Sequence, residues 1–186
     1  MKMKESRKPF QFSFSDRSFS RVGDCFGGSL LKNSHAKRAR PLNSKLPLHI
    51  VLRARRGGMR LPRTFAEISD IIVSTARKYG VRIYEQANVG NHVHLLVRIG
   101  KVWLWAAFIR ELTGRIARAM IVAGVAARGE RFWKCRPFTR IVQGWGKAFK
   151  IAKEYVYLNQ LEANGFISRK ETRTLNDLHS LFGDSA

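Results

Sequence analysis

The sequence predicts an α+β fold of the ferredoxin-like, split βαβ type, in which helices pack on an antiparallel sheet. Three observations carry this prediction. An alternating segment occupies residues 48–53, a β-hairpin pattern occupies residues 81–99, and a long helical pattern follows each of them. The resulting element order, β-α-β-β-α-β-α, is that of a split βαβ sheet. The chain shows no internal repeat of solenoid or propeller period.

The first strand and the first helix are predicted directly after Pro47. Apolar residues alternate through 48–53, which is the period of a strand. A loop with glycine follows at 55–62. Thr64 is predicted to cap the next helix, with Glu67 three residues later completing a capping box. An apolar stripe then supports a helix as far as Tyr79, and Gly80 is expected to end it.

The remaining elements are predicted by the same kinds of signal. Residues 81–89 and 92–99 indicate two strands on either side of the tight turn Gly90-Asn91. A helical pattern spans 102–127, with a bend expected near Gly124. A fourth strand is predicted at 138–142, and a helix at 147–163 that Asn164-Gly165 ends. A short helix is expected at 173–182.

Charge is the most unusual bulk property of the chain. There are 35 Lys and Arg against 13 Asp and Glu, which gives a formal net charge of +22. Basic side chains that neutralise phosphates release condensed counterions, so this imbalance predicts a nucleic-acid partner. An anionic membrane is the alternative. No apolar stretch approaches the roughly 20 residues of a spanning helix, however, and the basic residues are dispersed, so no membrane association is predicted.

We expect three parts in the chain: an N-terminal arm (1–45), a central domain (46–165) and a C-terminal tail (166–186). The arm holds eleven Lys or Arg and three acidic residues without sustained periodicity. It is therefore predicted to be largely irregular, either gripping a partner or acting as a solubilising tail. Cys25 and Cys135 form no CxxC pair, which favours a reducing cytosol. No secretory signal follows the basic residues 1–8, so a cytoplasmic protein is expected.

A pair of histidines stands at the head of an apolar strand, in Asn91-His92-Val93-His94. Residues two apart on a strand point to the same face, so His92 and His94 are predicted to project together. Two neighbouring imidazoles can hold a divalent metal ion. The alternative is two polar side chains on a half-exposed strand face.

Tyr155 and Asn159 have helical i, i+4 spacing, which places a phenol and an amide on one helix face. Tyrosine, with an unperturbed pKa of about 10, attacks phosphorus poorly until a metal or nearby cations favour the phenolate. The alternative is that Tyr155 only covers the core side of its helix. Tyr157 is a second candidate, but it lies about 200° further round the helix, so both cannot face the histidines.

The chain resembles the single-tyrosine HUH transposases, especially the REP-associated tyrosine transposases of bacteria, because these motifs follow one another in the order found in that family. The resemblance covers about residues 46–165. It rests on Gly90-Asn91-His92-Val93-His94-Leu95-Leu96-Val97, Tyr155-Val156-Tyr157-Leu158-Asn159, Leu48-His49-Ile50-Val51-Leu52-Arg53, Ile109-Arg110-Glu111-Leu112-Thr113-Gly114 and the segment 132–138. The chain departs from many relatives at Gly90 and at Gln160-Leu161, where a proline and a Pro-Val pair are common.

The resemblance implies an HUH-type catalytic domain that cuts and rejoins single-stranded DNA at hairpin-forming sequences. His92 and His94 would bind Mg²⁺ or Mn²⁺, with Asn159 as third ligand and Tyr155 as the nucleophile that forms a 5′-phosphotyrosine. No nucleotide cofactor would be needed. Relatives act as monomers or homodimers, and the expected location is the bacterial cytoplasm, at the nucleoid.

DNA contacts are expected where cations and aromatic side chains are interleaved. Residues 128–153 contain eight Lys or Arg and one acid, with aromatic residues among them, a combination that suits single strands. The alternative is that the aromatic rings fill the core. The candidates are Arg53, Arg131, Trp133, Lys134, Arg136, Arg140, Lys147 and Lys150. His49 is a candidate neighbour of the active site; the alternative for it is a structural histidine.

Three functions are therefore open on the sequence alone. The first is a metal-dependent tyrosine transesterase acting on DNA. The second is a catalytically silent nucleic-acid-binding module on the same scaffold. The third is a phosphoesterase that releases its product by hydrolysis and does not use Tyr155. A covalent DNA–protein adduct separates the first function from the other two.

Overall fold

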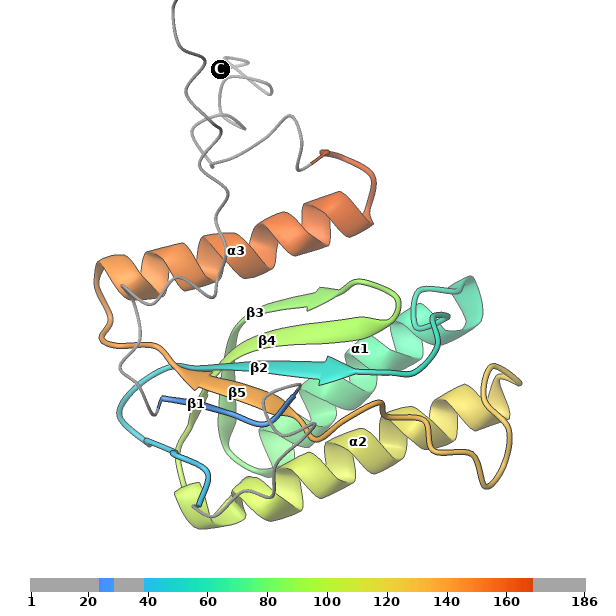
Figure 1. Ribbon diagram of the computed structural model, residues 1–186, viewed down its shortest axis with the longest axis horizontal. Coiled ribbons are helices and arrows are strands. Elements are labelled where there is room, and N and C mark those ends of the chain that lie inside the picture. The colour runs from blue at the N-terminus through green and yellow to red at the C-terminus, as the bar shows by residue number, and fades with distance from the viewer. Residues whose placement is uncertain (1–23, 29–38, 169–186) are drawn as a thin grey trace, which may run out of the picture.

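A computed structural model describes residues 24–28 and 39–168. Within them a five-stranded antiparallel sheet has the order β1-β5-β2-β4-β3. Helices α1 and α2 cover one face of the sheet and α3 lies across the other (Figure 1). The elements are β1 Cys25–Phe26, β2 Leu48–Arg53, α1 Pro62–Lys78, β3 Val81–Asn88, β4 His92–Ile99, a 3-10 turn Val102–Leu104, α2 Trp105–Val122, β5 Phe138–Ile141 and α3 Lys147–Ala163. The predicted α+β, ferredoxin-like fold is confirmed.

The larger apolar core lies between the sheet and the pair α1 and α2. Alternate residues of β2 and β4 point into it, as the period of a strand requires. Fully buried side chains from both helices, among them Ile68 of α1 and Phe108 of α2, complete this core. The strand residues in it are Leu48, Ile50, Leu52, Val93, Leu95, Val97 and Ile99.

The opposite face of the sheet has a smaller apolar cluster beneath α3. It is formed by Ala87, Leu96 and Val142 of the sheet segments together with Ala152 and Val156 of α3. The alternate residues of β2 and β4 that do not enter the larger core point to this face. These are the positions occupied by His49, His92 and His94, so α3 covers the histidines.

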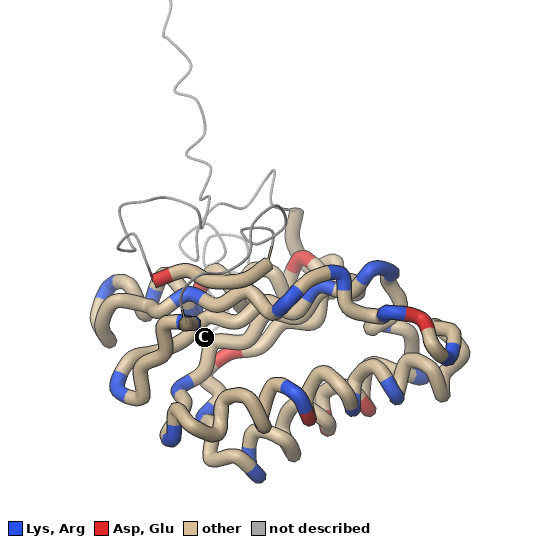
Figure 2. Tube along the Cα trace, turned by 60° about the horizontal axis from the view of Figure 1, so that its bottom comes forward, with Lys and Arg blue, Asp and Glu red and all other residues tan. Residues whose placement is uncertain are grey.

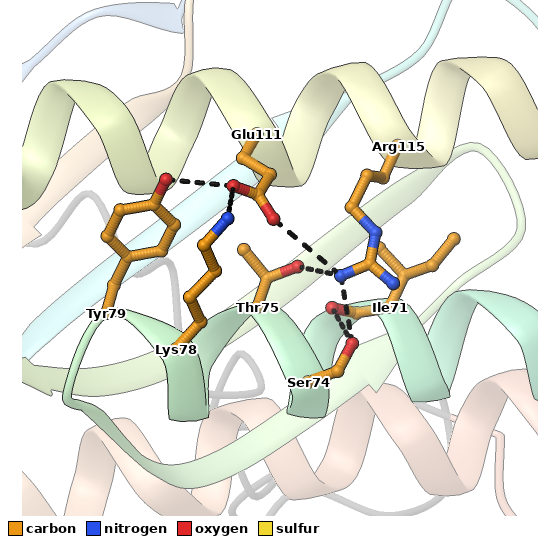
Figure 3. A network of polar contacts seen from close by, with 7 residues as sticks. All are labelled: Ile71, Ser74, Thr75, Lys78, Tyr79, Glu111 and Arg115. Carbon is orange, nitrogen blue, oxygen red and sulfur yellow. Dashed lines mark hydrogen bonds and ion pairs between the residues drawn. The ribbon is translucent and has the colours of Figure 1, made fainter.

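A polar network joins the outer sides of α1 and α2 (Figure 3). The Glu111 carboxylate accepts hydrogen bonds from Lys78 Nζ at 2.6 Å and from Tyr79 Oη at 2.8 Å. Arg115 Nη1 donates to Ser74 Oγ at 3.0 Å and to Thr75 Oγ1 at 2.9 Å. The hydrogen bond from Lys78 is the main reason that the pKa of Glu111 lies below its usual value. Glu111 belongs to one of the segments that resemble the transposases, and here its role is to join two helices.

Several details differ from the sequence predictions. The expected irregular arm contains β1, which pairs with β5 in the register Cys25 to Arg140. The predicted capping box is wrong: α1 begins at Pro62 with Leu61 as its N-cap. Thr64 lies inside the first turn and donates to the carbonyl oxygen of Gly58 at 2.7 Å.

The predicted long helix is also divided. A 3-10 turn precedes α2, which ends at Val122 rather than near residue 127. Gly124 follows with a φ of 69°, a conformation that glycine adopts without strain and that ends the helix. The helix expected at 173–182 and most of the arm lie outside the described residues. None of the helices in the described part is long and apolar enough to span a membrane.

Candidate active site

The two histidines of β4 lie side by side on the face covered by α3. Their ring centroids are 4.7 Å apart, with the rings nearly perpendicular. The adjacent strand β2 places Arg53 opposite His92 and Val51 opposite His94. His94 is buried, whereas His92 is half-buried beside the turn that opens the strand. The Oδ1 atom of Asn91 lies 2.5 Å from His92 Nδ1. This contact orients the His92 ring.

His49 extends this pair into a row of three imidazoles. Its Nε2 lies 3.1 Å from Nδ1 of His94. The two ring planes differ by 6° and their centroids are 5.3 Å apart. This separation equals the N···N distance plus the two ring radii, so the rings lie edge to edge in one plane rather than face to face. That geometry is an in-plane hydrogen bond between the two imidazoles.

Tyr155 approaches the same group from α3. Its ring centroid is 5.7 Å from that of His94 and 5.9 Å from that of His49, with an edge-on arrangement in both cases. Residues more than 60 positions apart in the sequence are thus brought into contact by packing α3 across β4. Tyr157 is 40% exposed on another side of the helix, as the turn angle between the two positions requires.

Asn159 lies one helical turn beyond Tyr155 and is buried. Its Nδ2 donates to the carbonyl oxygen of Tyr155 at 2.6 Å. This bond fixes the amide group and leaves Oδ1 as the atom that Asn159 could offer to a metal ion.

Hydrogen bonds join the end of α3 to the end of β3, and the residues that form them were not among the predicted site residues. Gln160 Oε1 accepts from the backbone N–H of Asn88 at 3.0 Å. Arg60 donates to the carbonyl oxygen of Asn88 and to Oδ1 of Asn164, both at 2.8 Å. Gln160 Nε2 also donates to Asn164 Oδ1 at 2.8 Å. These bonds fix the position of the helix that carries Tyr155.

Electrostatics keep His49 uncharged. Burial, assisted by the nearby charge of Arg140, lowers the pKa of His49 to about 3 from an ordinary value of 6.5. Arg140 lies opposite His49 in the pairing of β5 with β2 and is itself buried. At neutral pH, His49 is therefore a neutral imidazole that can donate through one nitrogen and accept through the other.

The expected DNA-contacting cations belong to several elements, and Lys and Arg positions are spread over the trace without forming a single stripe (Figure 2). Most are exposed: Arg53, Arg131, Lys134, Arg136, Lys147 and Lys150. Arg140 is the exception, since it is buried next to His49. Trp133 is half-buried against the larger core, and its indole N–H donates to the carbonyl oxygen of Thr113 at 3.0 Å.

The donor set at the site fits a divalent cation in its chemistry. Two imidazoles on one strand face and a fixed amide supply nitrogen and oxygen donors without a thiolate, and neutral imidazoles are common ligands of divalent metal ions. Within the described ranges there is no group of three or more His, Cys, Asp or Glu arranged to hold a metal. The amide of Asn159 would therefore have to complete the set.

A ferredoxin-like sheet with paired histidines facing a helical tyrosine is the arrangement expected of a single-tyrosine HUH transposase. The family described as "Transposase IS200 like" matches residues 43–159, and the chain belongs to this family. Family membership makes it a transposase-type DNA endonuclease. No protein of curated description matches the chain in sequence.

Two solved structures are similar to it. One is a REP-associated tyrosine transposase bound to a REP hairpin, at 15% identity and a TM-score of 0.55, covering 72% of this chain and 76% of that chain. The other is a transposase-like protein of Deinococcus radiodurans, at 18% identity and a TM-score of 0.43, covering 67% of this chain and 98% of that chain. The first of these structures supports the fold.

Proposed function

We propose that this transposase cleaves and rejoins single-stranded DNA through a covalent 5′-phosphotyrosine on Tyr155. The observation that carries the proposal is the contact of the Tyr155 ring with the rings of His94 and His49. A tyrosine that only covered the core would not require a row of imidazoles at its edge. The family supports the reaction class, and this contact favours Tyr155 over the exposed Tyr157 as the nucleophile.

The proposed reaction is a transesterification. The phenolic oxygen of Tyr155 attacks the phosphorus in line, the new O–P bond forms, and the bond from phosphorus to the 3′ oxygen breaks. The phenolic proton is lost and the departing 3′ oxygen gains one, so protons balance over the step. Bond energy is conserved in the phosphotyrosine, so a later attack by a DNA hydroxyl reverses the step without a nucleotide cofactor.

Mg²⁺ or Mn²⁺, held by His92, His94 and Asn159, would supply the Lewis acid that stabilises charge on the phosphate oxygens. The protein residues position the reacting groups. Asn91 orients His92, the hydrogen bond from Asn159 stiffens the turn of α3 that carries Tyr155, and Gln160 and Arg60 hold the end of that helix. Such positioning is a large part of the rate advantage of an enzyme.

An exposed cation beside the histidines and further exposed cations on α3 support DNA as the substrate. Arg53 lies opposite His92 at the end of β2, and Lys147 and Lys150 lie on the first turns of α3. A REP-associated tyrosine transposase of the same fold was solved bound to a REP hairpin. We therefore propose that hairpin DNA is also the substrate of this chain. Because the cations are dispersed, affinity should depend strongly on salt and little on any single side chain.

The test is incubation with single-stranded hairpin DNA and Mn²⁺, followed by denaturing electrophoresis to reveal a covalent DNA–protein adduct. We expect an adduct with the wild-type protein, none with Tyr155→Phe, and most of the wild-type amount with Tyr157→Phe. Tyr157 is the matched control because it is the same residue type, two positions along the same helix. Loss of the adduct in Tyr157→Phe alone would reassign the nucleophile.

The remaining outcomes separate the alternatives. A wild-type protein that shifts hairpin DNA but yields neither adduct nor cleavage would be a binding module. Cleavage that yields no adduct and persists in Tyr155→Phe would indicate a phosphoesterase.

A further inference from the structure

His49 is a buried polar residue to which the reaction above assigns no role. It is 2% exposed and lies on β2, which pairs with β4 on one side and β5 on the other. A strand held on both sides is a rigid support. Its Nε2 faces Nδ1 of His94 at 3.1 Å in the plane of both rings. Two ring nitrogens at this distance share one proton in a hydrogen bond. The nitrogen that carries this proton determines whether Nε2 of His94 has a free lone pair for a metal ion.

The proton can lie on either of the two nitrogens. If His49 Nε2–H donates to His94 Nδ1, a neutral His94 carries its own proton on Nε2, and that nitrogen has no lone pair to offer. If His94 Nδ1–H donates to His49 Nε2, the Nε2 atom of His94 keeps its lone pair. Only the second arrangement allows His94 to bind a metal ion through the nitrogen that points away from His49.

We propose that His49 is a positioning residue that accepts the Nδ1–H of His94 and so holds His94 in the tautomer able to bind a divalent cation. This inference rests on the proposed function, because it assumes that His94 is a ligand. It matches the general observation that a metal-binding histidine donates its other ring N–H to a fixed acceptor, whose removal typically costs about 10- to 100-fold in metal affinity.

The two neighbouring strands fix the position of His49 beside His94. In the pairing of the strands, His49 lies between Leu96 of β4 and Arg140 of β5. A histidine that only filled space would not need its ring coplanar with that of His94.

Two substitutions of His49 separate an acceptor from a space-filling ring. His49→Gln keeps a hydrogen-bond acceptor near the position of Nε2, whereas His49→Phe keeps an aromatic ring and removes the acceptor. The first measurement is the affinity for Mn²⁺ alone, by isothermal titration without DNA. His92→Ala serves as the variant that lacks a ligand.

We expect His49→Phe to bind Mn²⁺ about 10- to 100-fold more weakly than the wild type, and His49→Gln to recover most of the affinity. Equal Mn²⁺ affinity in His49→Phe and the wild type would overturn the proposal. So would equal losses in both variants, which would indicate a role of shape alone.

A second measurement needs no substitution and no metal. Long-range ¹H–¹⁵N correlation spectra of the wild-type protein report which nitrogen of each histidine carries the proton. We expect His94 to be protonated on Nδ1, and a proton on Nε2 would contradict the proposal. Failure of the proposed function gives a different result: wild-type protein and His92→Ala would then bind Mn²⁺ equally, or no DNA adduct would form.

Discussion

The two faces of the sheet are covered by different kinds of side chain. The face under α1 and α2 is a continuous apolar core, whose buried polar side chains include Thr64 and Thr75 of α1, while the charged groups Glu111 and Lys78 lie at the solvent-exposed edge. The face under α3 has a small apolar cluster and several buried polar side chains: His49, His94, Arg140 and Asn159. Burying polar groups costs free energy unless each finds a partner, and on the second face His49 and His94 contact each other while Asn159 donates to the carbonyl oxygen of Tyr155.

The comparison predicts that substitutions on the two faces affect different properties. Changes on the α3 face should remove chemistry and leave folding largely intact. Changes on the α1 and α2 face should alter stability and leave the chemistry of the folded fraction unchanged.

The largest effect is expected from His92→Ala. Removal of one of the two paired imidazoles should eliminate metal-dependent DNA cleavage, while hairpin affinity, which depends on dispersed cations, stays close to that of the wild type. Cleavage assays with Mn²⁺ and gel-shift titrations of the same protein measure the two properties. Unchanged cleavage would show that the site on the α3 face does not use His92.

A large effect on stability is expected from Leu112→Ala. Leu112 is fully buried between α2 and the sheet, and truncation of such a leucine usually costs about 2–5 kcal/mol. Denaturant unfolding measures the loss. Val122→Ala on the same helix is the control, because Val122 is 77% exposed. Its substitution should change stability by no more than about 0.5 kcal/mol. A similar loss in both variants would mean that the larger core does not dominate stability.

The smallest effect is expected from Glu111→Gln in the exposed polar network. The Lys78 hydrogen bond lowers the pKa of Glu111 below 4.5, so the folded state favours the ionised form. Stability from this source is present above the ordinary pKa and is lost as pH falls through the lowered pKa. The variant should therefore melt slightly below the wild type at neutral pH. Thermal unfolding at several pH values should show the difference disappearing in acid, and a difference that grows in acid would contradict this assignment.

Much of the fold could be predicted because its signals are local. The alternation of 48–53 and the hairpin around Gly90 specify strands through the period of two, and the same period places His92 and His94 on one face. Helical spacing likewise places Tyr155 and Asn159 one turn apart.

The features that could not be predicted join distant parts of the chain. Pairing of β1 with β5 and the bonds of Arg60 to Asn88 and Asn164 depend on tertiary packing, and no periodic pattern encodes them. The failed capping box at Thr64 has a local cause: Pro62 at the first helical position begins the helix earlier. Burial of Arg140 was also not predictable from a run of cations, since the sequence does not show that β5 places this residue between Cys25 of β1 and His49 of β2.

The most direct test of the account is to locate the DNA on the protein. Wild-type adduct formed with hairpin DNA and Mn²⁺ is digested with nuclease and trypsin, and the peptide that follows Lys153 is fragmented in a mass spectrometer. We expect a phosphodeoxynucleotide on Tyr155. Its presence on Tyr157, or on no tyrosine of α3 in a protein that cleaves the DNA, would contradict this expectation.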